Sequence, residues 1–390
     1  MKTIRSSADL AINGAPPAYD EPLHVGRPNI GSKERFLQLV EQMFERRWLT
    51  NNGPLVQEFE GQIAAYHGVQ HCVAMCNGTI ALEIAIRALG LEGEVIVPSY
   101  TFIATAHALH WQAITPVFAD IDPATHTLDP AAVRRMITPR TTGIIGVHTW
   151  GHTADTEGLQ EIADDYGLKV IYDAAHAFGC SRKGALVGNF GECEVLSFHA
   201  TKFFNTFEGG AVLTNNGELA EQMRLMRNFG FAGMDRVIYP GTNGKMIEIA
   251  AAMGLVNLER VQRVIDTNKY NHNAYRDAVS DIPFLSVMPY DNQEHNNYQY
   301  VVMELSPEAP IRRDDLVRAL HAENILVRKY FWPGCHKMKP FVDLYPHAGL
   351  LLPNTEKVAE RVVVFPTGTT IQRADIDAIA GLLRLLFEGS

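Results

Sequence analysis

The residues with the clearest chemical potential are a lysine, an aspartate and a glycine-threonine pair, each beside a short apolar run. Lys202 and Asp173 follow such runs, and Gly78 and Thr79 begin a helical pattern. A lysine in apolar surroundings is less inclined to stay charged, so its amine can attack an aldehyde and form a Schiff base. A carboxylate can keep a heterocyclic nitrogen protonated. Backbone N–H groups at the start of a helix can bind a phosphate.

Each of these features also has an ordinary structural explanation. Lys202 could be a surface lysine, Asp173 a helix N-cap, and Gly78-Thr79 a plain helix start. Phe102, which follows another apolar run, could stack on a flat ring or pack in the core. Their combination carries more weight, because a phosphate cradle, a partner for a ring nitrogen and an amine are the three requirements of pyridoxal phosphate. The residues therefore favour pyridoxal phosphate as the cofactor.

Several other chemistries are disfavoured by missing motifs and by composition. The glycine patterns of dinucleotide and nucleoside triphosphate sites are absent, as are the serine-hydrolase elbow and the HExxH zinc helix. Five scattered cysteines predict neither a disulfide framework nor a metal site. A net charge of −10 disfavours a nucleic-acid partner. No apolar run reaches the roughly 18 residues of a membrane helix, so we expect a cytoplasmic protein without a membrane partner.

The elements that must position these residues are short apolar runs that alternate with helical patterns. Several runs are apolar throughout, which is typical of strands covered on both faces, and the alternation predicts an α/β fold with an open, largely parallel sheet. Ligands of such sheets bind at the carboxyl ends of the strands. The expected strands are His71–Cys76, Glu94–Val97, Pro116–Ala119, Gly143–His148, Lys169–Tyr172, Glu194–Phe198 and Gly210–Leu213, and the expected helices are Thr79–Leu89, Ile103–Gln112, Thr156–Tyr166 and Glu218–Arg227.

A long helical pattern from Met246 towards Tyr275 leads into a second region. Turn-rich segments follow, then one strong strand candidate, Tyr298–Leu305, and helices near residues 313–323 and 374–387. We interpret this region as a smaller C-terminal α/β domain. The predicted organisation is an N-terminal arm at residues 1–30, a large cofactor-binding domain at 31–265 and a small domain at 266–390.

A series of ordered motifs runs through nearly the whole chain. They are Trp48–Pro54, Asn77–Thr79, Thr101–Thr105, Pro116–Phe118, Asp173–His176, Ser197–Lys202, Glu208–Gly210, Gly241–Met246, and Tyr330–Pro333 with His336. In these motifs and their order the sequence resembles the DegT/DnrJ/EryC1/StrS aminotransferases, which are pyridoxal-phosphate enzymes that aminate nucleotide-linked keto sugars. So many motifs in one order make a chance match implausible.

The resemblance implies the fold of the aspartate-aminotransferase superfamily, the type I fold of pyridoxal-phosphate enzymes, and a homodimer with both active sites at the interface. It implies catalytic roles for Lys202, which binds the cofactor covalently, and for Asp173, which pairs with the pyridine nitrogen. The other implied cofactor-binding residues are Gly78, Thr79 and Ser197 at the phosphate, Phe102 against the ring, His176 near the phenolic oxygen, where many members have glutamine, and Asn243, which reaches the phosphate of the neighbouring subunit.

The stretches Val25–Ile30, Phe207–Gly210 and Arg227–Gly230 are most similar to family members that act at C4 of dTDP-4-keto-6-deoxyglucose and form dTDP-viosamine. The implied reaction moves an amino group from L-glutamate to a nucleotide-linked 4-keto-6-deoxyhexose, a type of sugar found in lipopolysaccharide O-antigens. Amination at C3 or of a cyclitol ketone, and a non-catalytic regulatory role, are open alternatives. A related dehydratase is disfavoured, because that class typically has histidine in place of Lys202.

Overall fold

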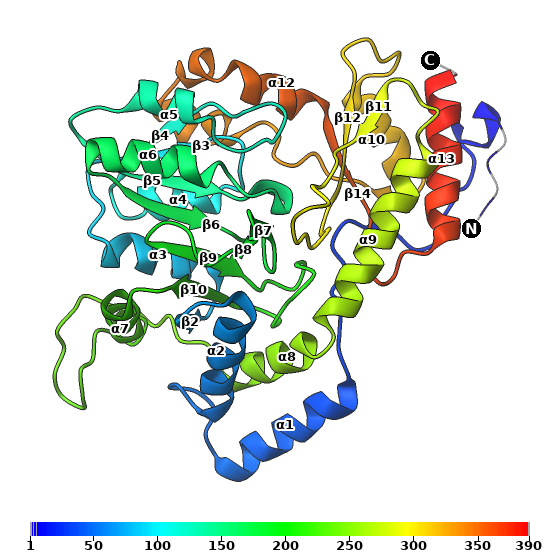
Figure 1. Ribbon diagram of the computed structural model, residues 1–390. Helices are drawn as coiled ribbons and strands as arrows, with labels where there is room; N and C mark the ends of the chain where they lie inside the picture. Colours follow the sequence, from blue (N-terminus) through cyan, green and yellow to red (C-terminus); the bar gives the residue numbers. More distant parts are fainter. Residues whose placement is uncertain (1, 3, 5, 389–390) are drawn as a thin grey trace.

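The computed structural model describes residues 2, 4 and 6–388 and contains two main sheets, the larger one in the N-terminal two thirds of the chain (Figure 1). The larger sheet has the strand order β2-β10-β9-β6-β5-β3-β4, and only β10 runs antiparallel to its neighbours. This confirms the predicted α/β class with a mostly parallel sheet. The strands are β2 (His71–Met75), β3 (Glu94–Pro98), β4 (Thr115–Ala119), β5 (Thr141–Val147), β6 (Lys169–Asp173), β9 (Cys193–Ser197) and β10 (Gly210–Thr214).

Both faces of this sheet are covered, so alternate residues of a strand enter different cores. In β2, Cys72 and Ala74 belong to one hydrophobic cluster, and Val73 and Met75 belong to another, as the two-residue period of a strand requires. This double burial explains why the strands are apolar throughout. One face carries α3 (Gly78–Ala88), α4 (Ala104–His110) and α7 (Gly217–Met226), and the other carries α2 (Pro54–His67), α5 (Pro130–Met136), α6 (Thr156–Tyr166) and α8 (Glu248–Leu258).

The smaller sheet is antiparallel, with the strand order β11-β12-β14. Its strands are β11 (Leu285–Val287), β12 (Val301–Leu305) and β14 (Val362–Phe365), and its core is shared with α9 (Val261–Ala278), α10 (Arg313–Ala322) and α13 (Arg373–Glu388). The N-terminal segment joins this part through β1 (Leu23–His24), which pairs in parallel with β13 (Ile325–Leu326). The remaining elements are α1 (Lys33–Arg46), α11 (Phe341–Leu344), α12 (Pro353–Arg361), β7 (Ser181–Arg182), β8 (Ala185–Leu186), and the 3-10 turns at Ser7–Asp9, Ala11–Asn13, Thr149–Gly151, Cys335–Lys337 and Ala348–Leu351.

The long helix predicted from Met246 to Tyr275 is two helices, because the chain breaks at Glu259 and Arg260, between α8 and α9. The sequence pattern hides the break because apolar residues continue through it. The first half of α9 contributes Ile265 to the core of the large sheet, and its second half contributes Tyr275 to the core of the small sheet. The helix therefore connects the two parts of the molecule (Figure 1).

The strand β14 was not predicted, since its four apolar residues follow α12 directly without a turn signal. The helices α1 and α2 were also not predicted. The domain boundaries after residues 30 and 265 stay predictions, and residues 1, 3 and 5 of the predicted arm and 389–390 of the predicted small domain lie outside the described residues. None of the described helices combines the length and apolar character needed to cross a bilayer.

Candidate active site

Seven of the eight predicted site residues line one cavity of about 390 Å³. The cavity lies at the carboxyl ends of β6 and β9, where the sequence predicted it, and beside the first turn of α3. Parallel strands end at the same edge of a sheet, so the polar groups that follow them meet there. The seven residues are Gly78, Thr79, Phe102, Asp173, His176, Ser197 and Lys202.

The start of α3 contributes hydrogen-bond donors to this cavity. The side-chain oxygen of Asn77, the N-cap, accepts from the N–H of Ile80 at 2.8 Å. Within the described part of the chain, the N–H groups of Gly78 and Thr79 have no acceptor. The hydroxyl-bearing residues Thr79 and Ser197 line the same cavity. Two N–H groups and two hydroxyls at the positive end of a helix dipole are suited to bind a phosphate.

Glycine is needed at two positions around these donors. A Cβ atom on Gly78 would lie 3.0 Å from the Cβ of Ser197, and a Cβ on Gly210, the first residue of β10, would lie 2.5 Å from the backbone nitrogen of Gly78. The second distance is shorter than any tolerated contact. A side chain at position 210 would therefore push β10 away from the first turn of α3 and open the cradle.

Asp173, the last residue of β6, has a carboxylate that is held in a fixed orientation. The hydroxyl of Thr105 donates to its Oδ2 at 2.8 Å, and the N–H of Ala175 donates to its Oδ1 at 3.1 Å. Thr105 is held in turn by Thr101, whose hydroxyl oxygen lies 3.1 Å from its own. A carboxylate has about four acceptor positions, so Asp173 can still accept a hydrogen bond from a ring nitrogen.

His176 is a buried, neutral imidazole packed beside two aromatic rings. Its ring is nearly parallel to those of Trp150 and Phe331, with centroid distances of 6.0 and 5.6 Å. Burial, and secondarily the charge of Lys202, holds the pKa of His176 well below its usual range. Its Nδ1 accepts from the backbone N–H of Trp150 at 3.4 Å, which leaves the ring proton on Nε2. His176 can therefore donate one hydrogen bond, but it does not supply a positive charge.

The amine of Lys202 has an unusually low proton affinity. Burial lowers the pKa of Lys202 from 10.5 to about 8, against the opposing effects of Asp173 and Tyr330, which favour the charged form. A pKa of about 8 means that both the neutral and the protonated amine are available near neutral pH. A group that must act as nucleophile and as proton carrier needs this property.

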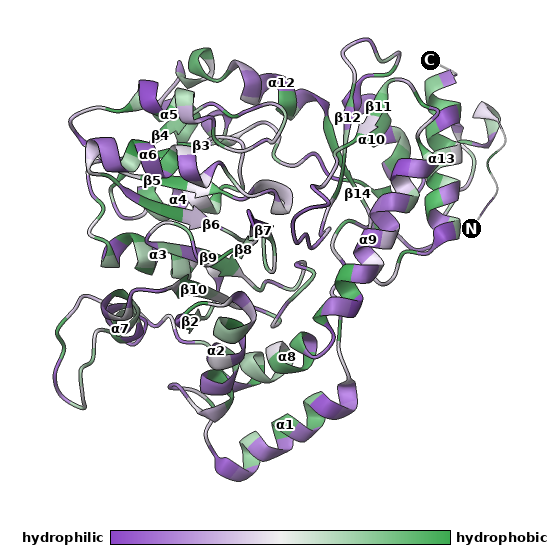
Figure 2. Ribbon diagram, in the orientation of Figure 1, coloured by the Kyte–Doolittle hydropathy of each residue, from purple (hydrophilic) through white to green (hydrophobic). Residues whose placement is uncertain are grey.

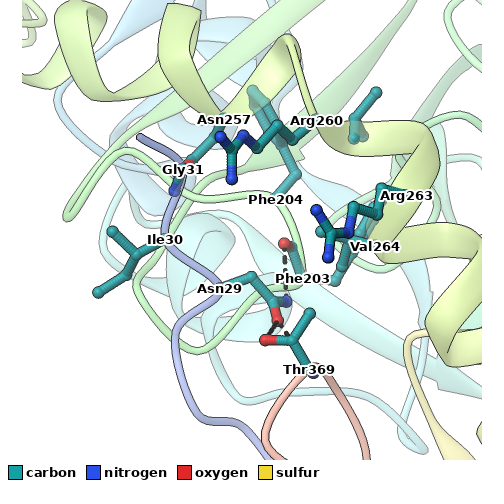
Figure 3. A pocket seen from close by; sticks show the side chains of 11 residues that line it. Asn29, Ile30, Gly31, Phe203, Phe204, Asn257, Arg260, Arg263, Val264 and Thr369 are labelled. Carbon is teal, nitrogen blue, oxygen red and sulfur yellow. Dashed lines mark hydrogen bonds between the residues drawn. The ribbon is translucent and has the colours of Figure 1, made fainter. Parts of the chain in front are cut away.

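Asparagine side chains anchor the loop that follows Lys202. Asn205 donates to the backbone oxygen of Asn29 at 2.9 Å, and Asn257 donates to the backbone oxygen of Asn205 at 2.8 Å. Asn29 donates to the backbone oxygen of Phe203 at 3.0 Å. Figure 3 shows Asn29, Asn257 and Phe203 around a separate cavity of about 200 Å³, which none of the predicted site residues lines. The N-terminal segment and α8 thus both fix the loop that carries Lys202.

Asn243 is the one predicted residue that does not line the cavity of its own chain. It lies in the loop between α7 and α8, where its side-chain oxygen accepts from the amine of Lys245 at 2.7 Å. The backbone oxygen of Gly244 accepts from the N–H of Cys76, just after β2, at 2.8 Å. The role of Asn243 at a neighbouring subunit stays a prediction.

Three residues without an assigned role from the sequence belong to the site. Thr105 orients Asp173, and Arg328 and Tyr330 line the cavity, with the Arg328 guanidinium 4.8 Å from the centre of the Tyr330 ring. His336 lies in the same sequence motif as Tyr330 but does not line this cavity; its ring bonds to Ser99 and a glutamate. The sequence motif indicates that this segment belongs to the site. The local sequence does not show, however, that Tyr330 lines the cavity and that His336 is buried outside it.

The chemistry of these groups fits pyridoxal phosphate. Four donors suit the phosphate, a fixed carboxylate with spare acceptor positions suits the ring nitrogen, and an amine of lowered pKa suits the aldehyde, all around one cavity. Among the residues that the structure describes, no group of three His, Cys, Asp or Glu side chains is placed to hold a metal ion.

The chain is similar to known aminotransferases. The chain matches the model of the DegT/DnrJ/EryC1/StrS aminotransferase family over residues 31–384. It is 37% identical to a dTDP-4-amino-4,6-dideoxy-D-glucose transaminase of Shigella dysenteriae, covering 94% of this chain and 99% of the relative. It is 35% identical to the GDP-perosamine synthase of Caulobacter vibrioides, covering 93% and 97%. The crystal structure of DesI, analysed in the presence of its TDP-sugar product, has a TM-score of 0.93 and 48% identity, covering 97% of this chain and 96% of that chain. These likenesses confirm the predicted fold type and cofactor.

The lowered pKa of Lys202 predicts how stability of the cofactor-free protein depends on pH. Between pH 8 and 10.5 the unfolded chain holds a proton that the folded chain lacks, so the free energy of unfolding should rise with pH in this window. Lys202→Met removes this effect. We expect the variant to be more stable than the unchanged protein at pH 7, by on the order of 2 kcal/mol after allowance for solvent screening, and the difference to shrink towards pH 10.5.

Urea denaturation at several pH values between 7 and 10.5 measures this difference. Lys339→Met is a suitable control, because the Lys339 side chain is 81% exposed. A stability difference for Lys202→Met that stays constant across this range would contradict the lowered pKa.

Proposed function

The chain belongs to the DegT/DnrJ/EryC1/StrS aminotransferase family, and from this premise we propose that it transfers the amino group of L-glutamate to C4 of a nucleotide-linked 4-keto-6-deoxyhexose. The proposed acceptor is dTDP-4-keto-6-deoxy-D-glucose, which becomes the 4-amino-4,6-dideoxy sugar. One observation carries the proposal: the cavity lined by Lys202 and Asp173 occurs in a chain that resembles, over nearly its full length, a transaminase named for that product. The likeness to DesI supports a thymidine nucleotide.

Pyridoxal phosphate, when bound, supplies a carbonyl carbon that can carry an amino group and a ring that takes up the electrons of a breaking C–H bond. We assign to Lys202 the covalent attachment of the cofactor and the movement of the proton of that C–H bond, because an amine with a pKa of about 8 can release and accept a proton near neutral pH. We assign Asp173 to the ring nitrogen, because a fixed carboxylate stabilises a protonated nitrogen next to it.

We assign the remaining residues to binding and orienting the cofactor. Gly78, Thr79 and Ser197 are assigned to the phosphate, and Phe102 to one face of the ring. His176, with its proton on Nε2, is assigned as donor to the phenolic oxygen. L-Glutamate and the keto sugar react in turn in the same cavity, and 2-oxoglutarate leaves before the sugar binds. The predictions of a cytoplasmic location and of an O-antigen product remain part of this proposal.

We further propose a homodimer in which Asn243 reaches the cofactor phosphate of the neighbouring subunit. In support, Asn243 lies outside the cavity of its own chain, in a loop whose Met234 is 93% exposed. The helix α1 also exposes Leu37 and Phe44, at 52% and 67%, and extends away from both sheets with apolar segments along its length (Figure 2). Exposed apolar side chains of this kind are typical of protein interfaces.

A substrate assay tests the proposed reaction. The cofactor-loaded protein should be yellow, L-glutamate should bleach the colour, and dTDP-4-keto-6-deoxy-D-glucose should restore it while the aminated sugar appears. NMR of the product should place the new amine at C4. An amine at C3, or turnover of a cyclitol ketone in preference to the nucleotide sugar, would favour the alternative substrates. Absence of bleaching by any amino donor would favour a non-catalytic protein.

Two substitutions test the assigned catalytic residues. Lys202→Ala should lower kcat by at least about 1,000-fold, because no other lysine is among the described residues that line the cavity. Asp173→Asn should still bind the cofactor but lose about 100- to 1,000-fold in kcat, because a neutral amide does not stabilise a protonated ring nitrogen. Steady-state kinetics with both substrates measures these effects, and cofactor absorbance reports binding. Near-normal turnover by either variant would exclude the assigned role.

Mixing two inactive variants tests the shared site. Asn243→Ala weakens the phosphate site of the partner, and Lys202→Ala removes the amine of its own site. A mixed dimer of the two has one site with both residues intact. The two variants are unfolded and refolded together. We then expect up to about a quarter of the activity of the unsubstituted enzyme, because half of the dimers are mixed and each mixed dimer has one working site of two. No gain over the separate variants would argue against a shared site.

A further inference from the structure

Three hydrogen-bonded side chains connect the smaller sheet to the region behind the wall of the active-site cavity. Glu304 lies on β12, His126 lies in the loop between β4 and α5, and Trp150 lies in the turn after β5. The Nε2 of His126 is 2.7 Å from a carboxylate oxygen of Glu304, and the indole N–H of Trp150 donates to the Nδ1 of His126 at 3.0 Å. His126 and Trp150 are fully buried, and neither is among the described residues that line the cavity.

The two bonds of His126 determine which of its ring nitrogens carries the proton. Its Nδ1 accepts the indole N–H of Trp150, so the ring proton is on Nε2 and is donated to the carboxylate of Glu304. A buried indole N–H needs an acceptor, and Nδ1 of His126 supplies it. Glu304 therefore keeps His126 in the ring form that can hold Trp150.

Trp150 has a backbone conformation that a tryptophan rarely adopts. Its φ is 65°, in the left-handed region, where a residue other than glycine is strained. Its backbone oxygen accepts from the hydroxyl of Tyr290 at 3.0 Å, and its ring lies nearly parallel to that of Phe331 at a centroid distance of 5.0 Å. Strained residues persist only where the surrounding contacts determine them. The bond to His126 is the contact that fixes the polar edge of the ring.

The turn that contains Trp150 also determines the proton position of His176. The hydrogen bond from the backbone N–H of Trp150 to Nδ1 of His176 leaves the His176 proton on Nε2. Its length of 3.4 Å is near the upper limit for such a bond. A small movement of residue 150 would therefore break it, and the proton of His176 could then occupy either nitrogen.

We propose that His126 is a positioning residue for His176. By holding the indole of Trp150, His126 keeps the backbone N–H of residue 150 within reach of Nδ1 of His176, and so keeps the donor of His176 on Nε2. His126 acts through Trp150 and touches neither cofactor nor substrate. The consequence for the reaction rests on the proposed function, in which His176 donates to the phenolic oxygen of the cofactor.

Two measurements on the cofactor-loaded enzyme test this role. Nitrogen NMR of isotope-labelled histidine rings shows which nitrogen of each ring carries the proton, and comparison with His176→Gln identifies the signals of His176. The pH midpoint of the visible absorption of the cofactor reports loss of the proton that its phenolic oxygen shares. A hydrogen bond from His176 to this oxygen favours the deprotonated form and lowers the midpoint.

His126→Phe and Trp150→Phe each keep an aromatic ring and remove one partner of the indole hydrogen bond. We expect both variants to show a mixture of the two ring forms of His176. Both should raise the midpoint by about half a unit to one unit, which is about a three- to tenfold change in the ionisation constant and part of the effect of a hydrogen bond to a charged group.

Two further variants distinguish positioning from a general loss of packing. His126→Asn keeps an acceptor near the place of Nδ1, and asparagine tolerates the φ of 60° at this position, so it should restore most of both measurements. His67→Phe is the matched control, because His67 is as buried as His126 but bonds to the backbone oxygen of Val187. It should leave the ring form of His176 and the midpoint unchanged.

The outcomes separate this inference from the proposed function. If His176 keeps its proton on Nε2 in both phenylalanine variants of the pair, or if His67→Phe changes it equally, the positioning role of His126 is wrong and the proposed function stands. If the proton moves and the midpoint does not, the positioning role holds and the assignment of His176 to the phenolic oxygen is wrong. Thermal melting shows which variants are folded, and Trp150→Phe keeps the test decisive if His126→Phe does not fold.

Discussion

The site depends on lowering the proton affinity of an amine that lies near a carboxylate. Burial disfavours the ammonium form of Lys202, and the negative charge of Asp173 favours it; the balance leaves the pKa at about 8. With less burial the amine would be protonated and unreactive at neutral pH, and with a closer carboxylate the ion pair would hold the proton. His176 adds to this balance because it is neutral, so the site gains a hydrogen-bond donor without a further positive charge.

Such a balance requires precise placement, and contacts far apart in the sequence provide it. Asp173 is oriented by Thr105 on α4, and the loop after Lys202 is tied by Asn205 to the N-terminal segment and by Asn257 to α8. Sheet topology supplies the remaining constraint. The antiparallel strand β10 places Gly210 against the first turn of α3, where the absence of a side chain lets the strand and the N–H group of Gly78 come together. The glycines of the Glu208–Gly210 motif therefore have a structural reason that is separate from chemistry.

The parts of the site that could be predicted from the sequence are those that depend on local order along the chain. Lys202 and Gly78 follow strands and Asp173 ends one, and parallel strands bring their carboxyl ends together whatever the details of packing. The role of Thr105 could not be predicted, because it depends on how α4 lies against the end of β6. Arg328 and Tyr330 reach the site from the segment after β13, and no pattern in the sequence sets the position of this segment relative to the larger sheet. The break between α8 and α9 was missed because apolar residues continue through it and both sides of the break, Leu255 and Val261, are buried in the same core.

The active-site cavity must serve two dissimilar substrates in turn. The amino donor and the keto sugar must each place a carbon atom within reach of the Lys202 amine. The part of the cavity around this amine therefore cannot be specific for either of them. Specificity for the larger substrate must then come from groups remote from the reacting carbon. Contacts with such groups can hold the sugar with its C4 in reach of Lys202, and binding energy gained at a distance is in this way used to orient the reacting atoms.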